Sequence, residues 1–270
     1  MRALSRSSVG NTSSPFKFLV VVGLSFLVYI GVQTSERRGK ERKALDEFNE
    51  MRRDMAAQMQ REVDKDGGVS SDTSAKVTEK IRQHFDRIAA AGGDKAMIAV
   101  SEVMAELQSR TAPYVAIQKR FEREAPFDMS NVKDKSDLVV RRTLGQELLR
   151  VNSDLLVLID SMDSRLREKL QQLGTQNPEG FVSGFMKTFN ESAAIHRRLR
   201  KTEETHARSL IAMTDLLEAQ WGQWKALNGT VNFDDANMTT RYNDLLNVVT
   251  KAAEDQVTAE RELIHLQQRK

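Results

Sequence analysis

The residues best placed for chemistry lie in the middle of the longest predicted helix, which runs from about residue 179 to residue 227. His196, Glu203 and His206 share one face of this helix and interrupt a seam that is otherwise apolar. Glu203 and His206 stand three residues apart, a spacing at which a carboxylate and an imidazole can bind one metal ion. The same residues suit a ligand-binding or pH-responsive site, or a buried polar layer that fixes helix register. The polar layer is favoured, because buried polar groups are usually hydrogen-bonded to their neighbours.

A second pair with the same spacing lies near the chain end, at Glu262 and His265. Two such pairs, with a glutamate from each of two further helices, resemble the metal-binding pattern of ferritin-like di-iron bundles. Here the pairs fall on consecutive helices rather than alternate ones, and His265 lies off the apolar stripe of its helix. No inward glutamate stands out on the remaining helices. The sequence therefore predicts neither a metal nor another cofactor.

His84 lies on the apolar stripe of an earlier predicted helix, between Ile81 and Ile88. Across a bundle it would be able to face His196 or His206. Histidines that are neutral when buried and charged when exposed act as pH switches. His84 is therefore a further candidate for the same site.

The densest basic stretch of the chain directly follows His196. Arg197, Arg200 and Lys201 are predicted to share an outer face of the helix, where they would bind lipid headgroups or an acidic partner. The favoured alternative is a solvated face on which these charges pair with acidic residues one turn away.

The chain has two tryptophans, Trp221 and Trp224, near the end of the same predicted helix. They either close the end of the bundle as core residues or anchor a protein partner. Core packing is the favoured interpretation of the two.

Composition removes several classes of function. The chain has no cysteine, which excludes disulfides, thiolate catalysis and cysteine-ligated metal sites. It has no glycine-rich phosphate loop, nucleophile elbow or H-E-x-x-H motif, so nothing indicates an enzyme. The formal net charge is +3, of which residues 1–65 hold +4. The remainder is close to neutral, so nucleic-acid binding is not expected.

Residues 16–33 are predicted to form a transmembrane anchor behind an N-terminal tail of residues 1–15. Residues 18–32 carry no charge; as a helix they would span about 22 Å, less than the ~30 Å hydrocarbon core of a bilayer. A cleaved signal peptide and an organelle presequence are the alternatives, although no clear cleavage site follows residue 32. Basic residues after the anchor favour a cytoplasmic bundle, whereas the short tail favours an extracytoplasmic one, which is the preferred orientation.

Residues 34–65 are predicted to form a charged helical stalk, because their apolar stripe is thin. Two copies of this stalk would be able to pair as a coiled coil and give a homo-oligomer, and a solvated single helix is the alternative. Residues 66–72 are small and polar and include two glycines. They are predicted to be the linker to the next domain.

Residues 73–270 are predicted to form an up-down antiparallel bundle of four or five helices. Apolar residues recur at steps of three and four, turns containing glycine or proline separate the segments, and no alternating run indicates a sheet. The predicted fold class is therefore all-α, with a transmembrane helix and a stalk before the bundle.

Together these features favour a single-pass, signal-anchored membrane protein whose bundle works by contact with the bilayer and with other membrane or envelope proteins. One alternative is an extracytoplasmic bundle that senses a small ligand or pH. A carboxylate–histidine metal-binding bundle is the least favoured interpretation.

Overall fold

The computed structural model describes residues 39–66, 69–90, 95–175, 178–227 and 230–268, and these residues are mostly helical. The α-helices are α3 (Gly39–Asp66), α4 (Ser71–Ala90), α5 (Lys95–Glu124), α6 (Lys135–Asp160), α7 (Met162–Gln172), α8 (Pro178–Ala219) and α9 (Ala236–Gln268). A 3-10 helix, η2 (Met129–Asn131), precedes α6. Strands β1 (Trp224–Leu227) and β2 (Thr230–Phe233) connect α8 to α9. The expectation of a helical bundle is confirmed.

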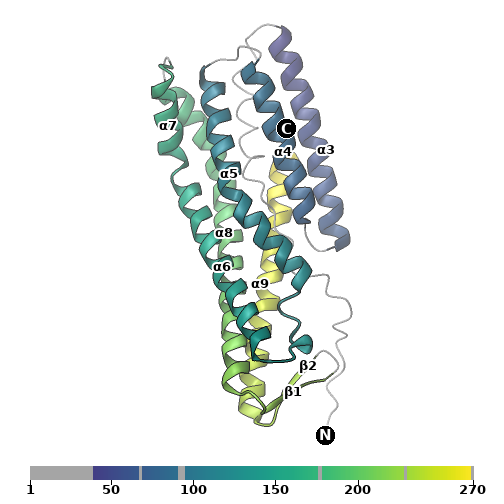
Figure 1. Cartoon of the computed structure of the whole chain (residues 1–270). Coiled ribbons are helices and arrows are strands. Elements are labelled where there is room, and N and C mark those ends of the chain that lie inside the picture. Colours follow the sequence, from purple (N-terminus) through teal and green to yellow (C-terminus); the bar gives the residue numbers. More distant parts are fainter. Residues whose placement is uncertain (1–38, 67–68, 91–94, 176–177, 228–229, 269–270) are drawn as a thin grey trace.

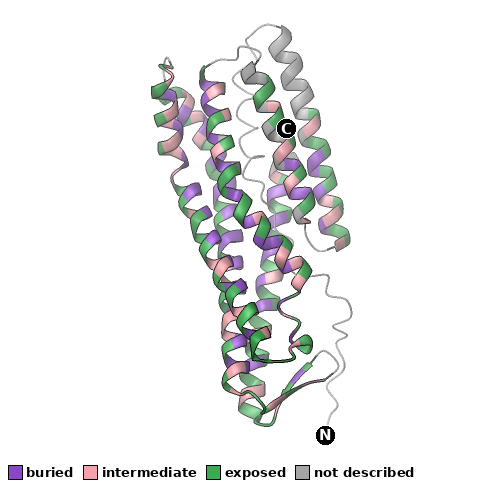
Figure 2. Cartoon of the chain, in the orientation of Figure 1, coloured by how far each residue is buried: buried purple, intermediate pink, exposed green. Residues whose placement is uncertain are grey.

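The helices form an elongated bundle in which α8 packs along both α6 and α9 (Figure 1). Asn152 on α6 contacts the backbone of Arg200 on α8, and Arg198 pairs with Glu262 on α9. Helices α5 and α7 pack beside this central group, and α3 and α4 cover its upper part. Figure 2 shows that buried residues follow the inner faces of the helices and exposed residues follow the outer faces, as amphipathic helices require.

Local signals explain where α6 begins and how closely it approaches α8. Asp134 caps α6 in a capping box with Asp137. A side chain added at Gly145 would place its Cβ 3.0 Å from Ile211 Cγ1 and 3.2 Å from the carbonyl oxygen of Ala207. Glycine is therefore the residue that permits the close contact between α6 and α8.

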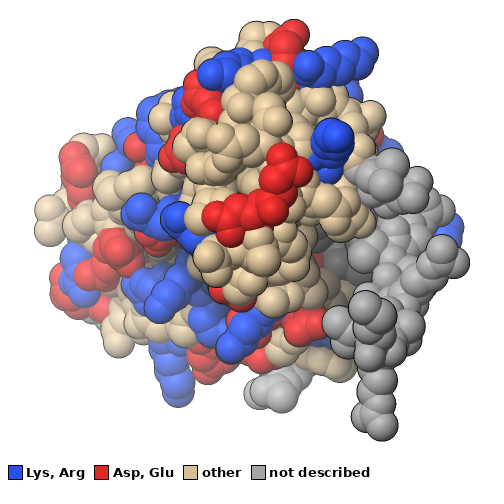
Figure 3. Space-filling view, turned by 90° about the horizontal axis from the view of Figure 1, so that it is seen from below, with Lys and Arg blue, Asp and Glu red and all other residues tan. Residues whose placement is uncertain are grey.

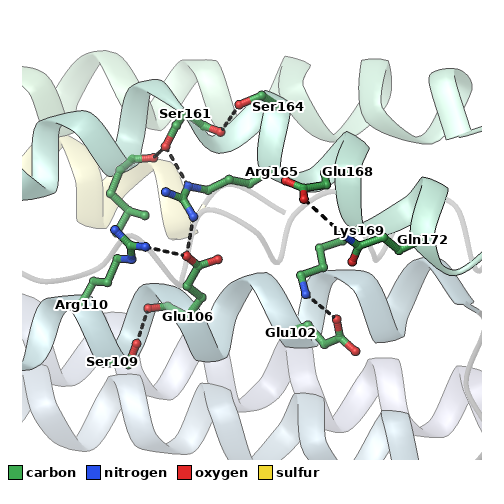
Figure 4. A network of polar contacts seen from close by, with 11 residues as sticks. Glu102, Glu106, Ser109, Arg110, Ser161, Ser164, Arg165, Glu168, Lys169 and Gln172 are labelled. Atoms are coloured by element: carbon green, nitrogen blue, oxygen red, sulfur yellow. Dashed lines mark hydrogen bonds and ion pairs between the residues drawn. The ribbon is translucent and has the colours of Figure 1, made fainter.

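Helix α7 is joined to α5 by a layer of ion pairs (Figure 4). Arg165 donates to the carboxylate of Glu106 and, at 2.9 Å, to the hydroxyl of Ser161. Lys169, one turn after Arg165 on α7, lies 3.1 Å from Glu102, one turn before Glu106 on α5. These partly exposed pairs align the two helices without adding to the apolar core.

The segment expected to be a separate stalk is part of the bundle. Helix α3 packs against α9, and its side chains at Met55, Met59 and Val63 are buried in the same core as those of α8 and α9. The predicted linker also contributes, because Val69 is fully buried. The described apolar residues of this helix are therefore covered within one chain.

The connection between α8 and α9 is a two-stranded antiparallel hairpin, which the sequence reading did not predict. Helix α8 ends at Ala219, eight residues before the predicted end, and Trp224 pairs with Phe233 across the strands. Residues 228 and 229 are an Asn-Gly pair, which is the strongest short-range sequence signal for a hairpin turn.

In the ranges that the structure describes, no helix is both long and apolar enough to cross a membrane. The predicted tail and anchor, residues 1–33, lie outside those ranges.

Candidate functional site

A cluster of ionisable side chains lies inside the bundle, on the face of α8 that meets α5 and α9. His196, Arg200 and Glu203 follow at steps of four and three residues, which puts them on one face of the helix. Their exposed fractions are 1, 3 and 0%. Charged side chains are rarely buried this completely unless they are paired.

Glu203 is held by a tyrosine and by an arginine. The Tyr114 hydroxyl, on α5, donates to Glu203 Oε1 at 2.5 Å, and Arg200 Nη2 lies 2.8 Å from the same oxygen. The guanidinium also sits over the Tyr114 ring, 4.5 Å from its centroid. Asn152 Nδ2, on α6, donates to the carbonyl of Arg200 at 2.8 Å. The site is therefore built from three helices.

A second buried carboxyl group, Glu260, comes from α9. Its side chain is fully buried, and Gln256 Nε2 donates to its Oε1 at 3.0 Å. The backbone of Val69, just before α4, also hydrogen-bonds to this carboxyl group. Glu260 thus connects the corner between α3 and α4 to the centre of the bundle.

Burial dominates the electrostatics of both carboxyl groups. It raises the pKa of Glu203 to about 7, although the charge of Arg200 and the hydrogen bond from Tyr114 act in the opposite direction. It raises the pKa of Glu260 to about 8, and the nearby charge of Glu203 adds to that rise. Burial also raises the pKa of Tyr114 well above its ordinary value, so this residue stays a neutral donor.

One arginine thus stands beside two carboxyl groups. Burial lowers the pKa of Arg200, but Glu203 and Tyr114 raise it by more than burial lowers it. The pKa of Arg200 is therefore above its ordinary value, and the guanidinium stays charged. Within the described part of the chain, Glu203 Oε2, Glu260 Oε2 and Arg200 Nη1 are buried without a hydrogen-bond partner. If both carboxyl groups were ionised, the cluster would carry an uncompensated negative charge in a desolvated place.

His206 belongs to a different part of the interior. Its Nε2 lies 3.2 Å from the carbonyl oxygen of Val249 on α9, and the Phe127 ring packs against it with centroids 6.3 Å apart. Burial lowers the pKa of His206 to about 4, so the imidazole is neutral. Glu203 and His206 therefore have separate partners, one on α5 and the other on α9.

The second carboxylate–histidine pair lies on the surface. Glu262 accepts two hydrogen bonds from Arg198, at 2.9 and 3.0 Å, and His265 is exposed. In the described ranges, no three histidine, aspartate or glutamate side chains lie close enough to hold a metal ion. The resemblance to di-iron bundles gains no support from this arrangement.

His84 is half-buried on α4, and α4 packs mainly against α5, whereas α8 packs mainly against α6 and α9. That His84 faces His196 or His206 across the bundle stays a prediction.

The basic run of α8 divides between the surface and the interior. Arg197 is exposed and pairs with Asp160 on α6, with nitrogen–oxygen distances of 2.9 and 2.7 Å, and Lys201 is exposed as well. The prediction that Arg200 shares this outer face was wrong, because its side chain is buried beside Glu203. Arg200 follows His196 by one turn, so it belongs to the inward face.

The two tryptophans lie together after the end of α8. Their ring centroids are 5.6 Å apart with an edge-to-face geometry, and Trp224 Nε1 donates to the carbonyl of Leu217 at 2.9 Å. Trp224 is half-buried on β1, while Trp221 is 36% exposed in the preceding turn. One ring thus supports the other at the surface.

The sequence reading missed Tyr114, Gln256 and Glu260. A signal for the last two was present, because Val249, Gln256, Glu260 and Leu263 continue the apolar stripe of α9 at helical spacing. Tyr114 follows Pro113 inside a helix, and nothing in its local sequence indicates a charged partner.

The buried cluster has the chemistry of a proton-holding site. It contains ionisable oxygen atoms with raised pKa values, an arginine that fixes one of them, and burial that keeps solvent away. Comparisons of the chain with protein-family models, with curated protein sequences and with solved structures found no match.

Proposed function

We propose that this protein is a membrane-anchored interaction protein whose helical bundle contacts a protein partner through the hairpin end, meaning Trp221, Gly222 and strands β1 and β2. The observation that carries the proposal is Trp221, a large aromatic side chain that is 36% exposed at the tip of a charged bundle. Exposed tryptophans held in a fixed orientation are the side chains that most often dominate protein interfaces.

The geometry around Trp221 supports a rigid anchor. Its ring packs edge to face on Trp224, and Trp224 is fixed by its hydrogen bond to Leu217. Gly222, with φ of +86°, makes the turn between the two rings in a conformation that side chains rarely adopt. A preorganised aromatic residue loses little conformational freedom when it binds.

The charges at this end favour a protein over a bilayer surface. Seen from below, acidic and basic side chains are interspersed over the described surface (Figure 3). Asp234 and Asp235 are exposed and directly follow strand β2 in the chain. Anionic lipid headgroups would be repelled by these carboxylates.

The membrane part of the proposal rests on the uncharged run of residues 18–32, which lies outside the described ranges. In this proposal the run retains the protein in the membrane and the bundle lies on the extracytoplasmic side. The absence of recognised catalytic motifs in the sequence is consistent with a contact function.

Site-specific photo-crosslinking of the full chain in its native membrane tests the proposal. A photoreactive amino acid at position 221 is expected to give a discrete adduct. The matched control is position 157, because Val157 is 63% exposed on α6 and lies outside the hairpin end. Trp224→Ala removes the ring that supports Trp221 and is expected to reduce the adduct several-fold while the bundle stays folded.

Two results would contradict the proposal. Recovery of the uncrosslinked monomer alone from position 221 would exclude a stable contact there. Equal adducts from positions 157 and 221 would show that crosslinking reports general crowding. Extraction with alkaline carbonate checks the anchor separately, since a retained anchor keeps the chain in the membrane pellet.

A further inference from the structure

The buried cluster lies at a joint between two parts of the bundle. Glu260 on α9 accepts from the backbone of Val69, which lies in the short connection between α3 and α4. That connection is held to α3 by Glu62, whose carboxylate accepts from the Ser70 amide at 2.9 Å and from the Thr73 hydroxyl at 2.5 Å. These hydrogen bonds hold the α3–α4 corner together, and Glu260 is its inner contact.

The charges of the cluster are not balanced. Arg200 is the close partner of Glu203, at 2.8 Å, and Tyr114 donates to the same oxygen. Glu260 has neutral hydrogen-bond partners instead, namely the Gln256 amide and the Val69 backbone. Its Oε2 is buried and has no partner within the described residues. An ionised Glu260 would therefore be desolvated without a cation of its own.

We propose that Glu260 carries a proton while α3 and α4 are docked on α9, and that loss of this proton to solvent releases the α3–α4 corner. The step is Glu260–COOH giving a carboxylate and a free proton, with no other bond changed. Because α3 begins at residue 39, close after the predicted membrane anchor of residues 16–33, the joint would relate the pH around the bundle to the position of α3 and α4 near the membrane.

Groups from every packed element face this joint. Helix α8 contributes Arg200 and Glu203, and α5 contributes Tyr114. On the α3 side, Asp64 lies 3.8 Å from Arg261 of α9, at the exposed edge of the same contact. The acidic residues Glu203 and Glu260 are the buried pair, whereas Asp64 keeps its solvent contact. Release of the proton therefore changes the charge inside the joint rather than at its rim.

The sign of the effect follows from the two states of Glu260. Burial raises its pKa to about 8 in the docked state, whereas a carboxyl group exposed by undocking returns to its ordinary value, about 4.5. Docking of the α3–α4 corner on α9 is therefore strongest below about pH 4.5, the pKa of the exposed carboxyl group. It weakens as the pH rises, until the docked Glu260 also ionises near pH 8. Over that interval one released proton changes the docking equilibrium about tenfold per pH unit.

Hydrogen exchange on the full chain in detergent micelles measures this equilibrium. After correction for intrinsic exchange, protection of the Val69 and Ser70 amides is expected to fall about tenfold per pH unit between pH 5 and pH 8, then level off. Amides at the centre of α6 are expected to lose less protection, because α6 lies outside the joint.

Two variants separate the proposed proton from general charge effects. Glu260→Gln is neutral at every pH and keeps the shape of the side chain, so protection of Val69 should become independent of pH. Glu262→Gln changes an exposed glutamate on the same helix, paired with Arg198, and should keep the wild-type slope. A slope that persists in Glu260→Gln would overturn the proposal.

If Glu260→Gln does not fold, the distance between α3 and α6 can be measured instead in a chain that keeps Glu260 and the other residues of the joint. The chain has no cysteine, so spin labels can be placed through Ala57→Cys on α3 and Ser153→Cys on α6, both exposed. Their separation is expected to lengthen between pH 5 and pH 9, while a reference pair at Ser153→Cys and Glu254→Cys stays constant. An unchanged α3–α6 distance over this range contradicts the release of α3. Neither readout involves the hairpin end, so failure here leaves the contact proposal untouched.

Discussion

At Arg200, burial and pairing act in opposite directions on the stability of the bundle. Desolvating the guanidinium is costly, and its contacts with Glu203 and the Tyr114 ring offset that cost. Removing the cation would leave two buried carboxyl groups without an opposite charge. A buried ion pair of this kind contributes little net stability when intact, yet its disruption is expensive.

Arg200→Met is expected to lower the free energy of unfolding at pH 8 by about 3–5 kcal/mol, the usual cost of breaking a buried ion pair. The loss should be smaller at pH 5, where both glutamates hold protons and no uncompensated charge remains. Arg197→Met is the matched control, because its pair with Asp160 is exposed and worth less than about 1 kcal/mol. Urea denaturation of the full chain at the two pH values measures both. Equal losses for the two variants would mean that the Arg200 pair has no special role.

For the individual residues, the sequence predicted where the buried site lies on α8 but not which residues of other helices contribute to it. The polar gap in the apolar seam of α8 predicted buried His196, Glu203 and His206, and all three are buried. The partners of Glu203 and His206 on other helices depend on how α5 and α9 rotate against α8. The sequence of one helix does not contain that rotation, so it could not show that Glu203 and His206 have separate partners.

Among the elements, α3 shows how a weak apolar stripe can still belong to a core. Four of its residues are nearly fully buried against the rest of the bundle: Met55, Ala56, Met59 and Val63. Methionine adapts its shape to irregular gaps, which lets a narrow stripe pack against α9. The rest of the described surface of this helix is polar, as its charged sequence indicates.

Met59→Ala distinguishes a packed helix from an independent stalk. A buried methionine shortened to alanine costs about 2–5 kcal/mol, so the thermal midpoint of the whole bundle should fall. Arg53→Ala, at an exposed position on α3, should change the stability by less than about 0.5 kcal/mol. Circular dichroism during heating compares the two. If both variants melt like the unaltered chain, α3 does not contribute to the core.

The helices themselves were predictable, and their connections were less so. The three- and four-residue spacing of apolar residues identified the helices that became α6, α8 and α9, because that pattern depends on one helix alone. The boundary between the predicted stalk and the bundle was not predictable, because a Gly-Gly pair at residues 67 and 68 is compatible with a linker between domains and with a turn inside one domain. The hairpin after α8 was overlooked because its strands are four residues long, too short for alternation to register.

For the whole molecule, the interior groups predict an unusual dependence of stability on pH. The pKa values of Glu203 and Glu260 are raised, so their stabilising contribution is complete below about pH 4.5 and is lost as the pH rises towards 7 and 8. The pKa of His206 is lowered to about 4, so its contribution is complete above about pH 6.5 and is lost on acidification. Between pH 6.5 and pH 8 these two carboxyl groups change charge while His206 stays neutral.

The unfolding free energy of the full chain is therefore expected to fall between pH 6.5 and pH 8, by about 1.4 kcal/mol per pH unit for each titrating carboxyl group. His206→Gln should remove the loss of stability that His206 causes between pH 6.5 and pH 4. His265→Gln, at an exposed position, is its control. Urea titrations at half-unit pH steps measure the profile. A flat profile from pH 6.5 to pH 8 would show that the buried carboxyl groups are not proton-holding.

The pairing of Trp221 and Trp224 has an optical consequence. They are the chain's only tryptophans, and their ring centroids lie 5.6 Å apart with an edge-to-face geometry at the hairpin. The tryptophan fluorescence of the protein therefore comes from one place, and the edge-to-face pair should give an excitonic band in circular dichroism. Changes in that emission would report on binding at the tip, while the α3–α4 corner stays spectroscopically silent until a dye is attached to it.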